Sequence, residues 1–190
     1  MLSKKSQGNT GRFNIKKRKG FTAVSLDESF FFYDSLVRKV WVDKNFRPVV
    51  TVTGSHRHSC LFGAVGLNGK QLFRQYDKFN EDNFYNYLKQ IHYKFTKCYL
   101  FLDKAPQHHK SQKIRHYFEK YKDVLIPVWL PTAASPEFMV LEECWNISKH
   151  DLLVLAYYSS FTEFRKRIKK YIRTKRFKLN MHAYLTRSVS

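Results

Sequence analysis

Three acidic residues stand where they could do chemistry on phosphate. Asp27 and Asp103 each follow a run of apolar residues, and Glu142 lies in a helix-like segment. The chain carries a formal net charge of +20, so carboxylates are scarce in it. Three that converge repel one another unless divalent cations lie between them, and such clusters hold Mg²⁺ or Mn²⁺ for chemistry on phosphodiesters. The hypothesis is that the fold brings these three side chains together.

The composition is that of a single globular domain. The chain has 190 residues, 43% of them apolar, which suffices for a hydrophobic core. No apolar run reaches the roughly 18 residues that cross a membrane, and the N-terminus lacks the apolar segment of a signal peptide. Cys60, Cys98 and Cys144 are too widely separated for a disulfide framework or a CxxC metal site. We therefore expect reduced, buried thiols in an intracellular protein.

Positive charge gathers at both ends of the chain. Residues 1–19 carry seven Lys and Arg and no acid, and residues 161–190 carry ten against one acid, which leaves +4 for residues 20–160. Such ends suit nucleic acid, because neutralising phosphates releases condensed counterions. An anionic membrane surface would also attract them, and a merely solvated basic surface is the plainest alternative. We favour nucleic acid, without a membrane, because the basic ends flank a carboxylate-bearing core.

Apolar periodicity separates strands from helices. Strands are expected over residues 21–27, 48–52, 58–67, 70–76, 98–102 and 124–129, and helices over residues 84–95, 110–121, 137–150 and 161–176. Residues 30–33 either continue the first strand or pair with it. Asn68-Gly69 predicts a two-residue type I′ hairpin, Asn80 a helix cap, and Pro127 a strand at a sheet edge or a strand end.

This order predicts an α/β fold in which an antiparallel meander and parallel strands form one mixed sheet flanked by helices. Strands that end at Asp27 and Asp103 put both carboxylates near one region of the sheet, and the following helix can carry Glu142 above it. We expect a disordered basic leader over residues 1–19, one domain over 20–176 and a basic tail over 177–190.

The segment Asp103-Lys104-Ala105-Pro106-Gln107-His108 is unusual for a structural turn, although Asp103 could simply cap that turn and His108 lie at the surface. It resembles the Asp-Asn-Ala-Pro-x-His motif of the IS630/Tc1-mariner superfamily of DDE transposases. Leu26-Asp27-Glu28-Ser29 resembles that family's first-carboxylate motif. Residues 130–145 are similar to its Leu-Pro-x-Tyr-Ser-Pro-x-Leu-Asn-Pro-Ile-Glu-x-x-Trp signature. The three motifs occur in the family's order, between about Phe21 and Arg176.

The resemblance implies a ribonuclease H-like fold in which Asp27, Asp103 and Glu142 are catalytic and bind two ions of Mg²⁺ or Mn²⁺. One ion would activate water or a DNA 3′-hydroxyl, and the other would stabilise the leaving oxygen during in-line displacement. Second candidates for this role are Glu28, Glu137 and Glu143. Glu142 is preferred because it aligns with the family's final carboxylate, whereas the next residue lies about 100° around a helix.

The resemblance also implies DNA as the partner, both transposon ends and target, with a homodimer as one assembly and no small-molecule cofactor. The location expected from it is cytoplasmic and nucleoid-associated. The residues expected to contact phosphate are Lys104, His108, Lys110, Arg165, Lys166, Lys169 and Arg173.

The chain departs from the family pattern at several positions. Lys104 stands in place of Asn and puts an ammonium beside the expected metal site, and Met139-Val140 replaces Asn-Pro ahead of Glu142. Family members usually carry a helix-turn-helix region before the catalytic domain, and only a short basic segment precedes Asp27 here. We therefore expect the catalytic half of a transposase. The alternatives are an inactive DNA-binding remnant and a ribonuclease H-like nuclease unrelated to transposition.

Overall fold

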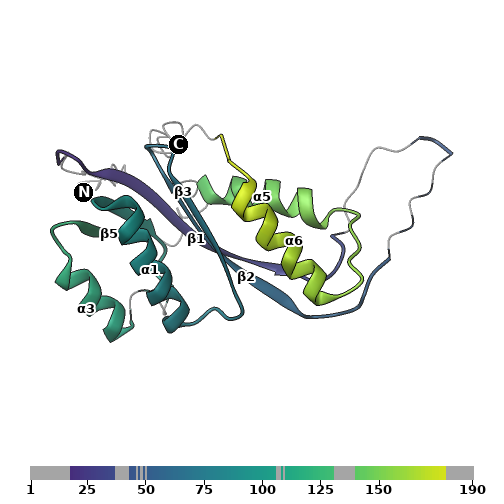
Figure 1. Ribbon diagram of the computed structural model, residues 1–190, viewed down its shortest axis with the longest axis horizontal. Helices are drawn as coiled ribbons and strands as arrows, with labels where there is room; N and C mark the ends of the chain where they lie inside the picture. Colours follow the sequence, from purple (N-terminus) through teal and green to yellow (C-terminus); the bar gives the residue numbers. More distant parts are fainter. Residues whose placement is uncertain are drawn as a thin grey trace, which may run out of the picture.

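The computed structural model describes residues 18–36, 43–45, 47, 49, 51–105, 108, 110–130 and 140–178, and within these a five-stranded sheet separates two pairs of helices (Figure 1). The strands are β1 (Thr22–Phe32), β2 (His58–Gly66), β3 (Gln71–Tyr76), β4 (Cys98–Leu102) and β5 (Leu125–Trp129). The helices are α1 (Glu81–Phe95), α3 (Gln112–Lys120), α5 (Val140–Leu153) and α6 (Phe161–Thr174).

The sheet has the strand order β3-β2-β1-β4-β5 and combines both kinds of pairing. β1, β2 and β3 form an antiparallel meander, while β4 and β5 add to the other side of β1 in parallel. The predicted mixed sheet flanked by helices is therefore confirmed. β5 lies at one edge of the sheet, as Pro127 predicts, because a proline has no N–H to donate to a further strand.

The prediction that the first strand ends at Asp27 is wrong. β1 continues to Phe32, so residues 30–32 extend it and Asp27 lies within the strand. Along this extension Phe31 is buried whereas Phe30 and Phe32 are exposed, the alternation of a strand with one covered face. The prediction of a strand around residues 48–52 also fails where it can be compared. Val49 and Val52 lie outside any strand and are largely exposed, so no sheet surface receives their branched side chains.

The turn between β2 and β3 differs from the predicted type I′ hairpin. Four residues, Leu67 to Lys70, lie between the two strands, and the N–H of Gly66 donates to the carbonyl oxygen of Lys70 at 2.8 Å, which closes a loop of three residues, Leu67 to Gly69. Gly69 has φ of +77°, but Asn68 does not share the positive φ that a type I′ turn requires at both positions. The loop is therefore of the three-residue kind that places glycine in the left-handed conformation.

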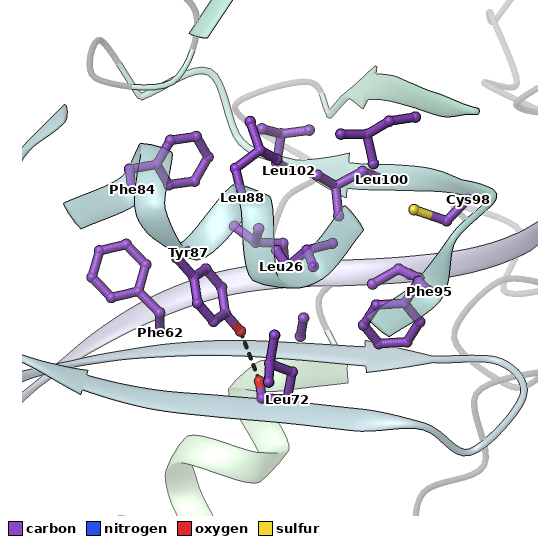
Figure 2. Close-up of a cluster of buried hydrophobic side chains, with 14 of the residues drawn as sticks. Leu26, Phe62, Leu72, Phe84, Tyr87, Leu88, Phe95, Cys98, Leu100 and Leu102 are labelled. Carbon is purple, nitrogen blue, oxygen red and sulfur yellow. Dashed lines mark hydrogen bonds between the residues drawn. The ribbon is translucent and has the colours of Figure 1, made fainter. Parts of the chain in front are cut away.

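One face of the sheet is covered by α1 and α3. Phe84, Tyr87 and Leu88 of α1 lie over Leu26 and Leu100 in a closed apolar cluster (Figure 2). The Tyr87 hydroxyl is buried within this cluster and donates to the backbone oxygen of Leu72 at 2.7 Å, which satisfies it. Asn80 caps α1 through its side-chain oxygen, as predicted, and Ser111 caps α3 in the same way.

The opposite face is covered by α5 and α6. Trp145 of α5 packs between Phe31 and Phe73, and α6 buries Phe164 and Ile168 while its other side stays exposed. The packed body continues past α6 to Phe177, whose backbone N–H and carbonyl oxygen both bond the side chain of Gln71.

The three cysteines are free and buried, as predicted. None of the described helices is long and apolar enough to cross a membrane.

Candidate active site

The pairing of β1 with β4 sets Asp27 beside Asp103. The two strands run parallel with Ser25 opposite Phe101, and continuing this register by two residues places Asp103, just past the end of β4, alongside Asp27. Neighbouring strands lie about 5 Å apart, so the two carboxylates share one small region of the sheet. We expected this neighbourhood to form from two strand ends, whereas in the structure it forms from the middle of β1 and the residue after β4.

Asp27 is held by the indole of Trp145. The Trp145 Nε1–H donates to Oδ2 of Asp27 at 2.9 Å. Gly63 lies directly opposite Asp27 on β2, and a Cβ at that glycine would come within 2.8 Å of both Trp145 and Leu141. The glycine therefore makes room for α5 to approach the ladder, which brings the indole within hydrogen-bonding distance of Asp27.

Burial raises the pKa of Asp27 to about 7. Loss of hydration is the largest cause, and the negative charges of Glu28 and Asp103 add to it. The hydrogen bonds from the backbone N–H of Glu28 and from Trp145 oppose the rise without cancelling it. A carboxylate in this position is poorly neutralised by the protein itself, which is the condition that a bound cation would relieve.

Glu28 points to the other face of β1, because successive side chains of a strand alternate. Its Oε1 lies 2.8 Å from Nε2 of His108, and Nδ1 of the same imidazole lies 2.8 Å from Oδ1 of Asp103. The Glu28 carboxyl is 6% exposed and Asp103 is 41% exposed, so His108 joins a buried acid to one that meets solvent. Burial raises the pKa of Glu28, and the contact with His108 opposes that rise.

The His108 side chain is fully buried and carries a positive charge at neutral pH. Burial alone would lower its pKa, but the hydrogen bonds to Asp103 and Glu28 outweigh that effect and raise the pKa to about 9. The ring also lies against Phe84, with ring centroids 4.2 Å apart. Both nitrogens therefore face carboxylates, and the expected phosphate contact from His108 has no exposed edge to make it.

Glu142 lies in the first turn of α5 and is exposed. It precedes Trp145 by three residues, and residues three apart on a helix have Cβ atoms about 5–6 Å apart on one side. Glu142 thus lies about one helical turn from the indole that contacts Asp27. Glu143 precedes Trp145 by two residues and does not share that side. Glu137 lies outside the described residues.

The donor chemistry of this region fits a hard divalent cation, since Asp27, Asp103 and Glu142 offer only carboxylate oxygens. Within the described ranges, however, no three His, Cys, Asp or Glu side chains are already gathered as a metal ligand set. The convergence of all three acids therefore stays a prediction.

The residues expected to contact phosphate fall into two places. Lys104 and Lys110 are exposed and lie on either side of His108 in the chain, and Lys104 directly follows Asp103. Arg165, Lys166, Lys169 and Arg173 lie on α6, where they line a hollow of about 620 Å³ against Phe73, Arg74 and Gln75 of β3. Arg165 forms an ion pair with Asp77 beside this hollow. The two groups are separate, so the structure does not gather all the predicted contacts at the carboxylates.

Two functional contacts escaped the sequence analysis. Trp145 reads as a core aromatic, and it is buried, but its N–H serves Asp27. Glu28 reads as a second choice of ligand, whereas it faces His108. The spacing Glu142-x-x-Trp145 was a usable signal for the first contact, because it puts both side chains on one side of a helix. The second contact joins residues 80 apart and has no local signature.

The family model described as DDE superfamily endonuclease matches residues 22–165. No curated protein matches the chain in sequence.

Among solved structures, the Mos1 strand transfer complex is similar with a TM-score of 0.59 at 16% identity, covering 86% of this chain and 49% of that one. The mariner Mos1 paired end complex with Mg has a TM-score of 0.58 at 15% identity, with 97% and 63% covered. The Mos1 mariner paired end complex with Mn has a TM-score of 0.57 at 16% identity, with 86% and 50% covered. These likenesses confirm the ribonuclease H-like fold, and the chain spans about half to under two thirds of the length of these structures.

Proposed function

Because this chain belongs to the DDE superfamily endonuclease family, we propose that it is a transposase catalytic domain that cleaves and transfers DNA strands with Mg²⁺ or Mn²⁺. The observation that carries the proposal is the placement of Asp27 beside Asp103, with Trp145 of α5 hydrogen-bonded to Asp27. Asp27 of β1 and Asp103 just past β4 lie together, and the Trp145 bond holds α5 next to Asp27. A third acid, from α5, would complete this site.

In this proposal Asp27, Asp103 and Glu142 bind two divalent cations. When bound, such ions activate the attacking oxygen and stabilise the leaving oxygen of an in-line displacement at phosphorus. The protein's part is to hold the ligands. The pairing of β1 with β2 fixes the backbone of Asp27, Trp145 orients its carboxyl group, and the first turn of α5 would bring Glu142 to it.

DNA would follow the exposed face of α6 towards the carboxylates. α6 and Trp145 pack on the same face of the sheet, so the cationic helix and the Asp27 carboxylate are reached from one side. Arg165, Lys169 and Arg173 recur every four residues and so form a row along the helix with steps of about 6 Å. Lys104 and Lys110 would add contacts beside Asp103. A row of this kind suits a phosphate backbone, which carries no sequence information in itself.

The partners proposed are transposon ends and target DNA, with a homodimer as the assembly. The similar solved structures are described as strand transfer and paired end complexes of Mos1, which supports the proposal by likeness of fold. This chain spans only part of those proteins, so its share in end recognition belongs to the proposal as well.

A second candidate function is DNA binding without catalysis. It is favoured by Lys104, whose exposed ammonium follows Asp103 directly where the family pattern has a neutral Asn. A cation at that position competes electrostatically with a metal ion. Calorimetric titration with Mn²⁺ separates the two candidates: binding that is lost in Asp27→Ala supports the enzyme, and absence of binding in the unchanged protein supports the remnant.

The direct test is nicking of supercoiled DNA by the full chain in Mn²⁺. We expect Asp103→Ala to lower the rate roughly a thousandfold or more, because a metal ligand supplies several kcal/mol of transition-state stabilisation. Asp82→Ala is the matched control, since Asp82 is an exposed acid on α1 that pairs only with Lys113 in the described structure. Undiminished nicking by Asp103→Ala would remove the proposal.

A further inference from the structure

A buried imidazole joins Glu28 of β1 to Asp103, which follows the end of β4 at the proposed metal site. His108 is fully buried, and its two nitrogens lie 2.8 Å from Oδ1 of Asp103 and 2.8 Å from Oε1 of Glu28. The backbone N–H of Ala105 donates to the same Asp103 oxygen at 3.1 Å. Two donors on one oxygen define the plane and direction of that carboxyl group. No part of the proposed reaction yet uses the buried bridge.

We propose that His108 is a positioning residue that holds Asp103 in the orientation for metal binding, and that Glu28 holds His108 and is not itself a ligand. The inference rests on the proposed function, because it assigns Asp103 to the metal. It changes the role of two residues: His108 acts inside the protein and not on phosphate, and Glu28 supports the site from behind.

The need for such a bridge follows from where Asp103 stands. β4 ends at Leu102, so no strand pairing fixes the backbone of Asp103, whereas Asp27 is still paired with Gly63 of β2. Its side chain is 41% exposed, and packing around it is correspondingly incomplete. An outer hydrogen-bonding partner that orients a metal ligand typically changes metal affinity 10–100-fold.

Glu28 is placed for support and not for coordination. It adjoins Asp27 in sequence, but neighbouring residues of a strand point to opposite faces, and Glu28 points towards the layer of α1 and α3. There it is 6% exposed, and its Oε1 faces His108. Phe84 lies against the imidazole, with ring centroids 4.2 Å apart. The His108 ring is therefore held in one orientation, because Phe84 packs against its face and Glu28 bonds its Nε2.

The first test is Mn²⁺ affinity measured by calorimetry on the full chain. We expect His108→Asn to weaken binding about 10–100-fold, with nicking partly restored by raising the Mn²⁺ concentration. Glu28→Gln should weaken Mn²⁺ binding less than His108→Asn does, because the amide oxygen still accepts from Nε2. His92→Asn is the matched control, since His92 also bonds through a ring nitrogen, at 2.9 Å from the Tyr117 hydroxyl, away from the carboxylates.

Two results of this titration would overturn the inference. Unchanged Mn²⁺ affinity in His108→Asn would show that the imidazole does not orient Asp103. A loss in Glu28→Gln as large as that in Asp103→Ala would make Glu28 a ligand.

The second test needs no metal and so separates the bridge from the proposed function. Thermal unfolding in EDTA is compared for Asp103→Ala, His108→Asn and the double variant. If the two side chains are bonded, the double variant loses less Tm than the two single losses combined, because the first change already removes the shared bond. Additive losses would overturn the bridge even if the chain binds Mn²⁺. If the Tm losses are coupled but the chain binds no Mn²⁺, the hydrogen-bonded bridge exists but does not support a metal site.

Discussion

Asp27 and Asp103 lie side by side, yet the fold holds them by different means. Asp27 stands inside β1, where Gly63 of β2 pairs with it, and a neutral indole N–H bonds its carboxyl group. Asp103 stands beyond the end of β4 and is oriented by an imidazole that carries charge. A residue within a sheet needs little help to keep its direction, whereas one at a strand end needs a strong partner.

The difference extends to solvation. Asp27 loses its hydration on folding and meets no positive side chain in the described contacts, so burial raises its pKa to about 7. Asp103 keeps part of its exposure and has a cationic neighbour. The charged form of Asp27 therefore lowers the stability of the folded protein, whereas Asp103 takes part in a stabilising contact.

The largest expected effect concerns Glu142, the acid of α5 that we propose joins this pair. Glu142→Gln should lower Mn²⁺-dependent nicking roughly a thousandfold, because it removes a ligand oxygen on the side of the helix shared with Trp145. Glu143→Gln should leave nicking near its original rate, since that side chain is rotated about 100° further around the helix. The nicking assay compares both directly. If Glu143→Gln lowers nicking more than Glu142→Gln does, the third ligand is Glu143. The helix side of Trp145 would then not identify that ligand.

Neutralising Asp27 and neutralising Asp103 should change the free energy of unfolding in opposite directions. In EDTA at pH 8, we expect Asp27→Asn to raise the free energy of unfolding by on the order of 2–4 kcal/mol, because a buried charge is removed. Asp103→Asn should lower it by about 1 kcal/mol, because the bond to His108 loses its charge assistance. Each kcal/mol corresponds to about 2–4 °C in Tm for a chain of this size, so thermal unfolding resolves both.

The pH dependence of the first change follows from the sign of the shift. The pKa of Asp27 is about 7 in the folded protein and about 3.9 when unfolded, so the folded state holds this proton more tightly. The unchanged protein therefore loses stability as pH rises from about 4 to 7, and Asp27→Asn escapes this loss. The two should have similar Tm at pH 4 and diverge by pH 8. A gain that is equally large at pH 4 would point to packing and not to charge.

Periodicity was sufficient to predict most elements that surround this pair. Apolar residues recur along one face of α1 and of α6, and they are continuous in β4. Each pattern indicates directly which side of the element faces the core. The position of Asp27 was harder to predict. Asp27 and Glu28 follow an apolar run, and such a pair of acids is typical of a strand end. β1 continues because Phe31, four residues after Asp27, is buried against Trp145 of α5.

The contacts that define the site were beyond reach for a different reason. The Trp145–Asp27 bond joins residues 118 apart, and it depends on Gly63 opposite Asp27 to admit the indole. The His108–Glu28 contact likewise depends on which face of β1 each acid takes, and a register error of one residue would exchange them. Motif resemblance named the acids Asp27 and Asp103 because it orders residues along the chain. It is silent on how side chains from separate elements meet.

The smallest expected effect asks whether DNA approaches from the face of Asp27 or from that of Glu28. Replacing Lys166, Lys169 and Arg173 on α6 by Ala should lower the slope of log affinity against log salt by about 0.9 for each phosphate that the helix no longer neutralises. The matched control removes three exposed lysines from the opposite layer: Lys89, Lys120 and Lys122. Binding of duplex DNA at several salt concentrations, by fluorescence anisotropy, measures both.

The two triple variants carry the same charge, so a non-specific effect of net charge would move both slopes alike. A fall confined to the α6 variant would place the phosphate backbone on the side where Trp145 meets Asp27, because α5 and α6 cover that face together. A fall confined to the control would place DNA over α1 and α3, against the layer that buries His108 and Glu28. In that second case the His108–Glu28 bridge would lie on the face that DNA contacts, and Trp145 would lie on the opposite face. The roles that we infer for the surroundings of Asp27 and Asp103 would then be exchanged.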